Sequence, residues 1–384
     1  MRRRVPELDA VRGLAALAIL VYHFYTRRLP FGWAAVDLFF VLSGYLITSL
    51  VLAHQESEDF LLRFYVRRGL RIWPIYYLSL LALVVLGPVL PRPSSMAGLP
   101  YYLTYTQNVA LCWSARAAEF SWYFKHTWTL AIEEQFYLLW PALILLAGRT
   151  RVVPLSLALL ATSVAARWEG CHWWTLAGRG DGFALGGLLA ALMCDADRVG
   201  RHRVEISRGL AALATAALAY LAVVQARGGL PDHGTPLWPA TTVLAINLAA
   251  FALVAGVVLH AGHPALRILR GRALGYLGQI SYGLYLYHMI ILRIKLDLAQ
   301  RFRIGHNFWV DALMLAASVA AAALSWHFIE RPILALKARF DFDPTSSPGR
   351  SATRAGSRVD PAHRVPGGPD RHAPATRPLG DLVA

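Results

Sequence analysis

Arg12 and His23 lie eleven residues apart in the first hydrophobic stretch of the chain, VRGLAALAILVYHFYT. A helix turns about 100° and rises about 1.5 Å per residue, so both side chains share one helix face, roughly 16 Å apart along the axis. Ionisable side chains are costly inside a membrane and mark functional sites there. The separation is about the length of a pantetheine arm. An arginine would hold a coenzyme A phosphate while the histidine acts on the thioester.

Four further hydrophobic stretches are expected to place ionisable side chains at about the depth of His23, in the outer half of the membrane. These candidates are Asp37, Glu133, Glu134, Arg179 with Asp181, and His288. A buried histidine near a carboxylate is a common arrangement for an oriented and tuned general base. The group therefore predicts acid–base chemistry in the outer half.

Each of these candidates also has a structural interpretation. Asp37 would pair with an arginine, and Arg179 would pair with Asp181 at a helix start. His288 would make a hydrogen bond that packs two helices together. Glu133 and Glu134 differ by about 100° around a helix, so they are not expected to face the same partner.

The opposite, inner face is expected to be cationic, because Arg12 lies near the inner end of its stretch and Arg67, Arg68 and Arg71 precede the third one. The planar guanidinium donates two hydrogen bonds at once and suits phosphates. Lipid headgroups are the alternative ligands. The arginines between 54 and 77 have apolar neighbours at helical spacing, which predicts an interfacial amphipathic helix that runs into Pro74.

The composition of the chain indicates that these side chains lie inside a membrane. The chain of 384 residues is 56% hydrophobic and 16% charged, whereas soluble proteins carry about a quarter charged residues. We therefore predict an all-α integral membrane protein with about ten transmembrane helices. The predicted spans are 9–26, 34–53, 75–90, 127–147, 152–166, 181–194, 209–224, 240–260, 275–293 and 310–328.

The net charge of +15 does not predict a nucleic-acid partner, because the cations fall in short loops between spans and in the C-terminal tail. Their slight excess on one side favours a cell-membrane protein with both termini cytosolic. Residues 1–340 are expected to form one transmembrane domain. Residues 341–384 are rich in Pro, Gly, Ser and Arg, which predicts a disordered cytosolic tail.

The three cysteines show no metal-binding spacing. Cys112 and Cys171 both fall on the outer side of this topology, so they would form a disulfide or remain two unpaired thiols. No cluster of His, Asp and Glu has the spacing of metal ligands, and no metal site is expected.

Seven segments together resemble the acyltransferase-3 family of O-antigen acetylase-like transmembrane O-acyltransferases, over about residues 5–335. They are ELDAVRGLAALAILVYH, VDLFFVLSGYLI, RRGLRIWPIYY, WTLAIEEQFYLLWP, RGDGFALG, GQISYGLYLYH and WHFIERP. The chain resembles the stand-alone branch without an extra hydrolase-like domain. That branch includes cell-surface glycan acetylases and acyltransferases that tailor macrolides.

The resemblance implies an acyl-CoA donor, used as a co-substrate with no permanently bound cofactor, and a hydroxyl acceptor on a sugar, a glycan or a macrolide-type metabolite. His23 matches the histidine taken as catalytic in the family, Arg12 its essential partner, and Glu133 the first glutamate of the WTL segment. His23 would act as a general base or form an acyl-histidine. The alternative function is a transporter in which His, Asp and Glu relay protons.

Overall fold

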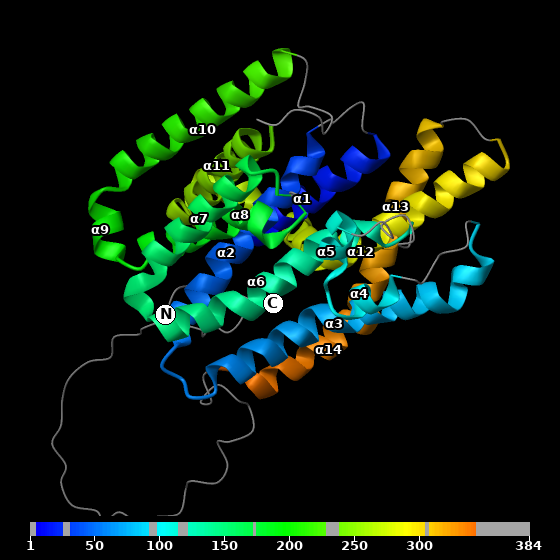
Figure 1. Cartoon of the computed structure of the whole chain (residues 1–384), viewed down its shortest axis with the longest axis horizontal. Helices are drawn as coiled ribbons and strands as arrows, with labels where there is room; N and C mark the ends of the chain where they lie inside the picture. The colour runs from blue at the N-terminus through cyan, green and yellow to red at the C-terminus, as the bar shows by residue number, and fades with distance from the viewer. Residues whose placement is uncertain are drawn as a thin grey trace, which may run out of the picture.

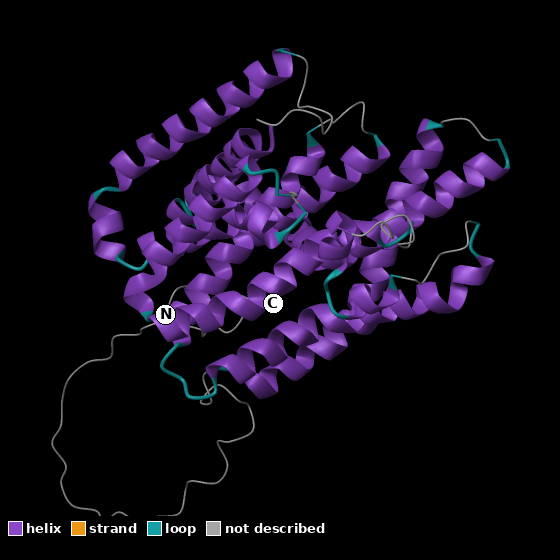
Figure 2. Cartoon of the chain, viewed as in Figure 1, coloured by secondary structure: helices purple, strands orange, loops and turns teal. Residues whose placement is uncertain are grey.

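The computed structural model describes residues 5–25, 31–91, 98–113, 122–171, 174–227, 238–303 and 307–342. Within these ranges the regular elements are helices and no strand occurs (Figure 2). The predicted all-α class is therefore confirmed. The long helices are α1 (Pro6–Phe24), α2 (Ala35–His54), α3 (Phe60–Leu86), α6 (Trp128–Ala147), α7 (Val152–Trp168), α8 (Leu176–Leu192), α10 (Arg203–Ala226), α11 (Trp238–Leu259), α12 (Arg272–Arg301) and α13 (Phe308–Ser325).

Each predicted span overlaps one of these long helices. Within the described residues, six segments, which overlap α2, α3, α6, α10, α11 and α13, are long and apolar enough to cross a membrane. The membrane character of the chain is thereby supported. Helices α7 and α8 are only 17 residues long, and the full number of ten crossings remains a prediction.

Helices α3 and α12 extend well beyond the spans predicted from hydropathy, because charged side chains inside them are buried. Helix α3 begins at Phe60 and continues through Pro74, so the predicted helix before Pro74 and the third span form one helix, and the interfacial position of its first part stays a prediction. Helix α12 extends to Arg301, beyond the predicted end at residue 293. Its Lys295 pairs with Asp311 of α13 at 2.7 Å, and its Asp297 accepts a hydrogen bond from Tyr123 at 2.7 Å.

Glycines let the central helices approach closely. A Cβ on Gly13 of α1 would overlap Gly278 of α12, and a Cβ on Gly186 of α8 would overlap the backbone of α2 at Val41 and Tyr45. Small residues at such crossings allow backbone contact between membrane helices. The pairs α1–α12 and α2–α8 are accordingly the most extensive helix contacts of the molecule.

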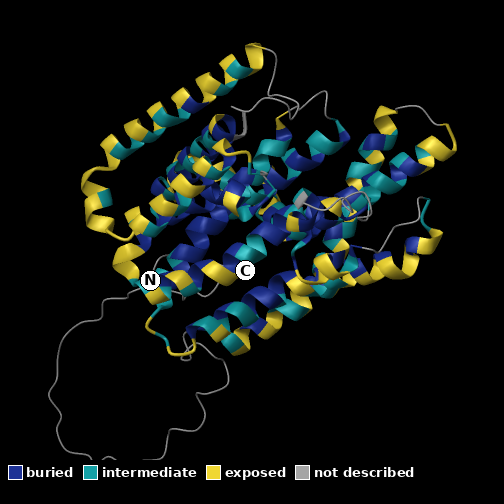
Figure 3. Cartoon of the chain, viewed as in Figure 1, coloured by how far each residue is buried: buried dark blue, intermediate teal, exposed yellow. Residues whose placement is uncertain are grey.

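The long helices in the left half of the molecule run side by side in one diagonal direction (Figure 1). Helix α10 lies at the edge, where it packs mainly against α11 and remains largely exposed (Figure 3). Helices α2 and α8 are buried instead. The short helices are α4 (Leu99–Leu103), α5 (Gln107–Trp113), α9 (Ala196–Arg201) and α14 (Arg331–Ala335).

The predicted disordered tail of residues 341–384 falls almost entirely outside the described residues, of which only 341 and 342 belong to it. The prediction therefore stays untested. The described cysteines Cys112, Cys171 and Cys194 form no disulfide, so the Cys112–Cys171 disulfide, one of the two predicted alternatives, is not formed in the structure.

Candidate active site

A narrow cavity lies between α1, α2, α3, α6 and α12. Its lining residues are Arg12, Ile19, Val36, Phe39, Phe40, Ser43, Arg68, Arg71, Ile72, Thr129, Leu130, Glu133, Tyr137, Ser281, Tyr282 and Tyr285. Four residues predicted from the sequence therefore share one cavity, namely Arg12, Arg68, Arg71 and Glu133. Because α1 and α12 cross at their glycines, this side of the cavity is built from two tightly packed helices.

Guanidinium groups gather at one end of the cavity, which is predicted to face the cytosol and is called the inner end. Arg68 and Arg71 lie one turn apart on α3 and are buried, and Arg12 reaches the cavity from α1. The Cζ of Arg68 lies 4.4 Å from the centre of the Tyr137 ring, but its Nε and Nη2 have no hydrogen-bond partner among the described residues. The Nη1 of Arg71 is likewise buried without a partner. Buried donors of this kind are costly unless a ligand accepts from them.

Arg67 does not line this cavity, although it neighbours Arg68. Its Nη1 donates to the carbonyls of Lys337 and Phe340, at 3.3 and 3.4 Å, and lies 3.5 Å from Asp341 Oδ1. The guanidinium also covers the ring of Phe342 at 5.3 Å. Arg67 therefore anchors the segment 336–342 against the inner end of α3.

This anchored segment carries a buried lysine that sequence reasoning missed. Lys337 is 6% exposed and interacts electrostatically with Arg71, Arg68, Arg67 and Arg12. Five basic side chains thus gather around the inner end. The hydrophobic periodicity of the sequence does not predict this position for Lys337, because the residue follows the last predicted span. Lys337 comes near α3 only when the chain is folded.

The two neighbouring glutamates of α6 face different surroundings, as expected from their 100° separation. Glu133 lines the cavity, and its Oε2 accepts a hydrogen bond from the Tyr137 hydroxyl at 3.0 Å. That hydroxyl also lies 2.9 Å from Ser43 Oγ. Glu134 instead accepts from Trp73 Nε1 at 3.0 Å and does not line the cavity.

Three imidazole rings meet beyond the outer end of the cavity. His23 Nδ1 lies 3.1 Å from Nε2 of the fully buried His288. The ring of His126 lies 5.5 Å from that of His288. Tyr285, which lines the cavity, contacts both, at 5.4 Å from the His126 ring and 5.7 Å from the His288 ring.

His126 was missed from the sequence, although a signal existed. It precedes the fourth predicted span by one residue on the outer side, at the predicted depth that selected the other candidates.

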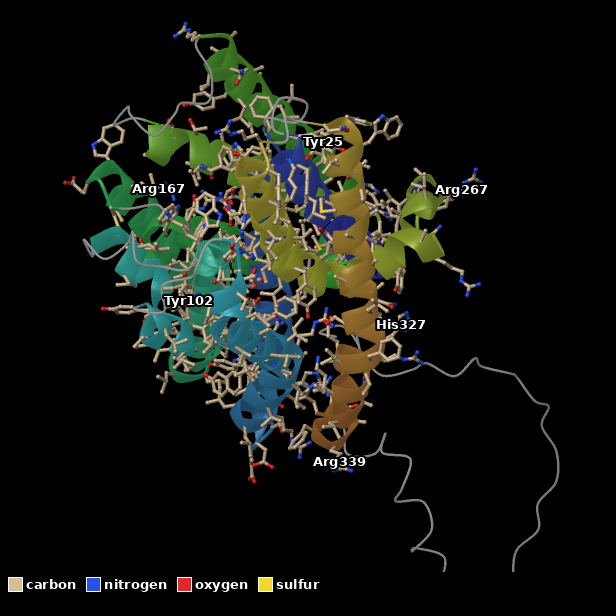
Figure 4. The ribbon with its side chains drawn as sticks, turned by 90° about the vertical axis from the view of Figure 1, so that its right-hand side faces the viewer. Tyr25, Tyr102, Arg167, Arg267, His327 and Arg339 are labelled. Atoms are coloured by element: carbon tan, nitrogen blue, oxygen red, sulfur yellow. The ribbon has the colours of Figure 1, made fainter. Side chains whose placement is uncertain are left out.

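Tyr25 follows His23 by two residues and Arg339 follows Lys337 by two. The labelled side chains of Tyr25 and Arg339 lie toward opposite ends of the molecule (Figure 4). His23 and His288 do not line the cavity themselves, and Tyr285 connects the cavity to His288.

Asp37 and Arg179 lie outside this cavity and form a buried ion pair of 3.0 Å. The sequence allowed Arg179 to pair with Asp181. In the structure Asp181 pairs with Arg167 instead, whose guanidinium donates to both carboxylate oxygens, at 3.0 and 2.8 Å. The sequence did not predict this pair, since Arg167 lies in the last turn of α7, before the helix of Asp181. The Cζ of Arg179 lies 5.7 Å from the ring of Phe40, a cavity wall residue, so this network supports the wall from behind.

No group of three or more His, Cys, Asp or Glu side chains within the described ranges has the geometry to hold a metal ion. The arrangement that the cavity does offer is a set of unsatisfied guanidinium donors at one end and a hydrogen-bonded histidine near the other. Such a pair of ends suits an extended substrate that is anionic at one end and reacts at the other.

Comparison with known proteins gives the family of this chain. The family model of the acyltransferase domain matches residues 5–327. The chain is similar to the peptidoglycan O-acetyltransferase OatA of Listeria monocytogenes, with 28% identity over 377 residues, and to the putative peptidoglycan O-acetyltransferase YrhL of Bacillus subtilis, with 30% identity over 359 residues. A putative O-acetyltransferase of Staphylococcus aureus is 26% identical over 370 residues.

Each of these alignments covers 86% of this chain and 56%, 55% and 57% of the three relatives, in the order given. The chain therefore spans little more than half the length of the curated relatives that it matches. No solved structure matches the chain.

Proposed function

The chain belongs to the acyltransferase domain family, and on this basis we propose that it is a membrane O-acyltransferase that moves an acyl group from acyl-CoA to a hydroxyl of its acceptor. The observation that carries the proposal is the cavity, which has unsatisfied guanidinium donors at its inner end and lies next to the His23–His288 pair at its outer end. The family match favours this function over the proton-coupled transporter.

The inner end of the cavity is the proposed site for the donor phosphates. Arg12, Arg68 and Arg71 project into it from two helices, and their planar guanidinium groups suit phosphate oxygens. Phosphates bound there would satisfy the buried donors of Arg68 and Arg71. The pantetheine arm then extends along α1 toward His23, over the roughly 16 Å that the eleven-residue spacing gives.

The chemistry at the outer end is proposed as general-base catalysis by His23. His23 takes the proton of the acceptor hydroxyl while the hydroxyl oxygen bonds to the thioester carbonyl carbon. The carbon–sulfur bond then breaks, and the leaving CoA sulfur takes the proton from the imidazolium. The products are the ester and free CoA, and His23 is neutral again.

Glu133 is proposed to position the acceptor. Its carboxylate lines the cavity on the side of α6 and is held by Tyr137, so it offers a hydrogen-bond acceptor to a second hydroxyl of a sugar. The relatives named as peptidoglycan O-acetyltransferases support a glycan or another sugar-bearing acceptor, such as a glycosylated macrolide. We propose the cell membrane as location, with both termini cytosolic, so that the arginine end meets cytosolic acyl-CoA.

Donor binding tests this function without knowledge of the acceptor. Purified protein in lipid nanodiscs is titrated with acetyl-CoA and with acetyl-pantetheine, which lacks the nucleotide and its phosphates. A charge-assisted hydrogen bond contributes about 1.5–3 kcal/mol, so acetyl-CoA should bind about tenfold to a hundredfold more tightly. Equal affinities for the two donors would contradict the proposed donor site.

A further inference from the structure

The hydrogen bonds of His288 determine the tautomer of His23, because both ring nitrogens of His288 have defined partners. His288 Nδ1 lies 3.1 Å from the carbonyl oxygen of Leu284, one turn earlier on α12. His288 Nε2 lies 3.1 Å from His23 Nδ1. The order of groups is therefore carbonyl, imidazole, imidazole.

A carbonyl oxygen only accepts hydrogen bonds, so the proton in the first contact belongs to His288 Nδ1. A neutral imidazole has one protonated nitrogen, and His288 Nε2 is then an acceptor. The proton in the second contact must therefore come from His23 Nδ1. This tautomer leaves the lone pair of His23 on Nε2, the nitrogen that faces away from His288.

Two further groups interact with His23 from outside the His288 pair. The carbonyl of Ile19, one turn earlier on α1, also interacts with His23 as a hydrogen-bond acceptor. The charged group that interacts with His23 is Arg293. No carboxylate is hydrogen-bonded to His23 or His288 within the described residues.

We propose that His288 is the positioning residue of the transfer reaction, in which it fixes the tautomer and the ring orientation of His23 so that Nε2 is the base. This inference rests on the proposed function. When His23 gains the acceptor proton at Nε2, its Nδ1–H becomes a charged donor, and the hydrogen bond to His288 strengthens. A buried imidazole thus has the role that a carboxylate has in other catalytic groups of this kind.

The rigid placement of His288 supports this role. The side chain is fully buried, and its ring is flanked by those of Tyr285 and His126, at 5.7 and 5.5 Å. Tyr285 is itself held, because its hydroxyl donates to the carbonyl of His126 at 2.6 Å. The acceptor nitrogen that faces His23 therefore has little freedom to turn away.

Two substitutions separate this role from mere packing. His288→Gln keeps an acceptor oxygen near the position of Nε2, whereas His288→Met fills similar space without an acceptor. His288→Met should lower kcat by about a hundredfold or more. In the Ser-His-Asp triad, the wrong tautomer of the catalytic histidine lowers kcat by about 10⁴. The KM for acetyl-CoA should stay within about twofold, because the donor phosphates bind at the far end of the cavity. His288→Gln should recover at least about tenfold of the lost kcat.

His327→Met is the matched control, since this histidine is exposed and lies at the molecular surface (Figure 4). The kcat of this variant should equal that of the unmodified protein. Nitrogen-15 NMR of histidine-labelled protein gives a readout that does not need activity. The His23 signals, identified by their loss in His23→Gln, should show a protonated Nδ1 and a bare Nε2.

A protonated Nε2 on His23, or a His288→Met kcat equal to that of the unmodified protein, would overturn the role of His288. A protein that transfers no acyl group while its His23 carries the expected tautomer would instead contradict the proposed function, and leave the tautomer assignment standing.

Discussion

Arg67 and Arg68 are adjacent on α3 but meet different partners. Arg68 lines the cavity, whereas Arg67 binds the backbone of residues 337 and 340. Arg68→Gln should therefore weaken acetyl-CoA binding about tenfold to a hundredfold, as expected for the loss of a charged phosphate contact. Calorimetric titration of both variants with acetyl-CoA and acetyl-pantetheine measures the effect.

Arg67→Gln is the matched control for Arg68, and it should leave the preference for acetyl-CoA close to that of the unmodified protein. An equal loss of preference in both variants would assign Arg67 to the donor site as well, which was the expectation from the sequence. An unchanged preference in Arg68→Gln would remove this arginine from the donor site.

The two glutamates of α6 offer a second comparison of neighbours. Glu133→Gln removes the charge that lines the cavity, and misplacement of the acceptor should lower kcat on the order of a hundredfold. Glu134→Gln keeps an oxygen that accepts from Trp73, so its effect on kcat should be much smaller. Steady-state rates of ester formation distinguish them, and a larger loss for Glu134→Gln would reverse the assignment.

At the residue scale, helical phase could be predicted from the sequence, and contacts could not. Spacing put Arg12 and His23 on one face of α1 and separated Glu133 from Glu134. The choice between Arg67 and Arg68 depends on how α3 is rotated against its neighbours. The same holds for Asp37, whose partner Arg179 comes from another helix.

At the element scale, the crossing of α2 and α8 holds one wall of the cavity. Gly186→Ala would place a methyl group against the backbone of Val41 and Tyr45, with no flexible side chain that could move aside. Such overpacking costs about 1–3 kcal/mol. We expect a fall in the thermal unfolding temperature of several degrees, together with lower activity.

Gly209→Ala is the matched control, because open space surrounds this glycine of α10. Alanine favours a helix by about 1 kcal/mol over glycine, so the unfolding temperature should stay or rise. Thermal unfolding monitored by circular dichroism compares the two variants. A Gly186→Ala protein as stable as the unmodified one would show that α2 and α8 are not in backbone contact.

The helices themselves could be predicted from hydropathy, and their ends could not. Hydropathy placed every long helix but began the third span at residue 75, because it scores arginine as exposed. Arg67, Arg68 and Arg71 are in fact buried within α3. The start of α8 is set by Thr175, whose hydroxyl accepts from the Gly178 amide at 2.9 Å, which extends this helix beyond the span predicted from residue 181.

At the scale of the whole molecule, the account requires the arginine end of the cavity to face the cytosol. Alternation of the long helices then puts Cys194, which follows α8, on the cytosolic side, and Cys171 on the outer side. In variants that retain only one of these thiols, an impermeant maleimide should label Cys171 in intact cells. Cys194 should react only after the membrane is opened.

Cys112 is unsuitable as the outer probe, because burial raises the pKa of its thiol to about 11, and the reactive thiolate is scarce at neutral pH. Its labelling rate should therefore rise with pH until the pH approaches 11. Labelling of Cys194 in intact cells would invert the orientation. The sequence indicated this orientation only weakly, because arginine is abundant in loops on both sides.

The central claim is that His23 performs acyl transfer at the outer end of a cavity that binds the donor at its inner end. The most direct measurement is ester formation from acetyl-CoA by purified His23→Gln, with acetyl-CoA binding measured on the same preparation. Loss of the base should lower the transfer rate by about 10²–10⁴, while the donor affinity stays within about twofold because the arginine end is intact. Transfer by His23→Gln at the rate of the unmodified protein would contradict the account.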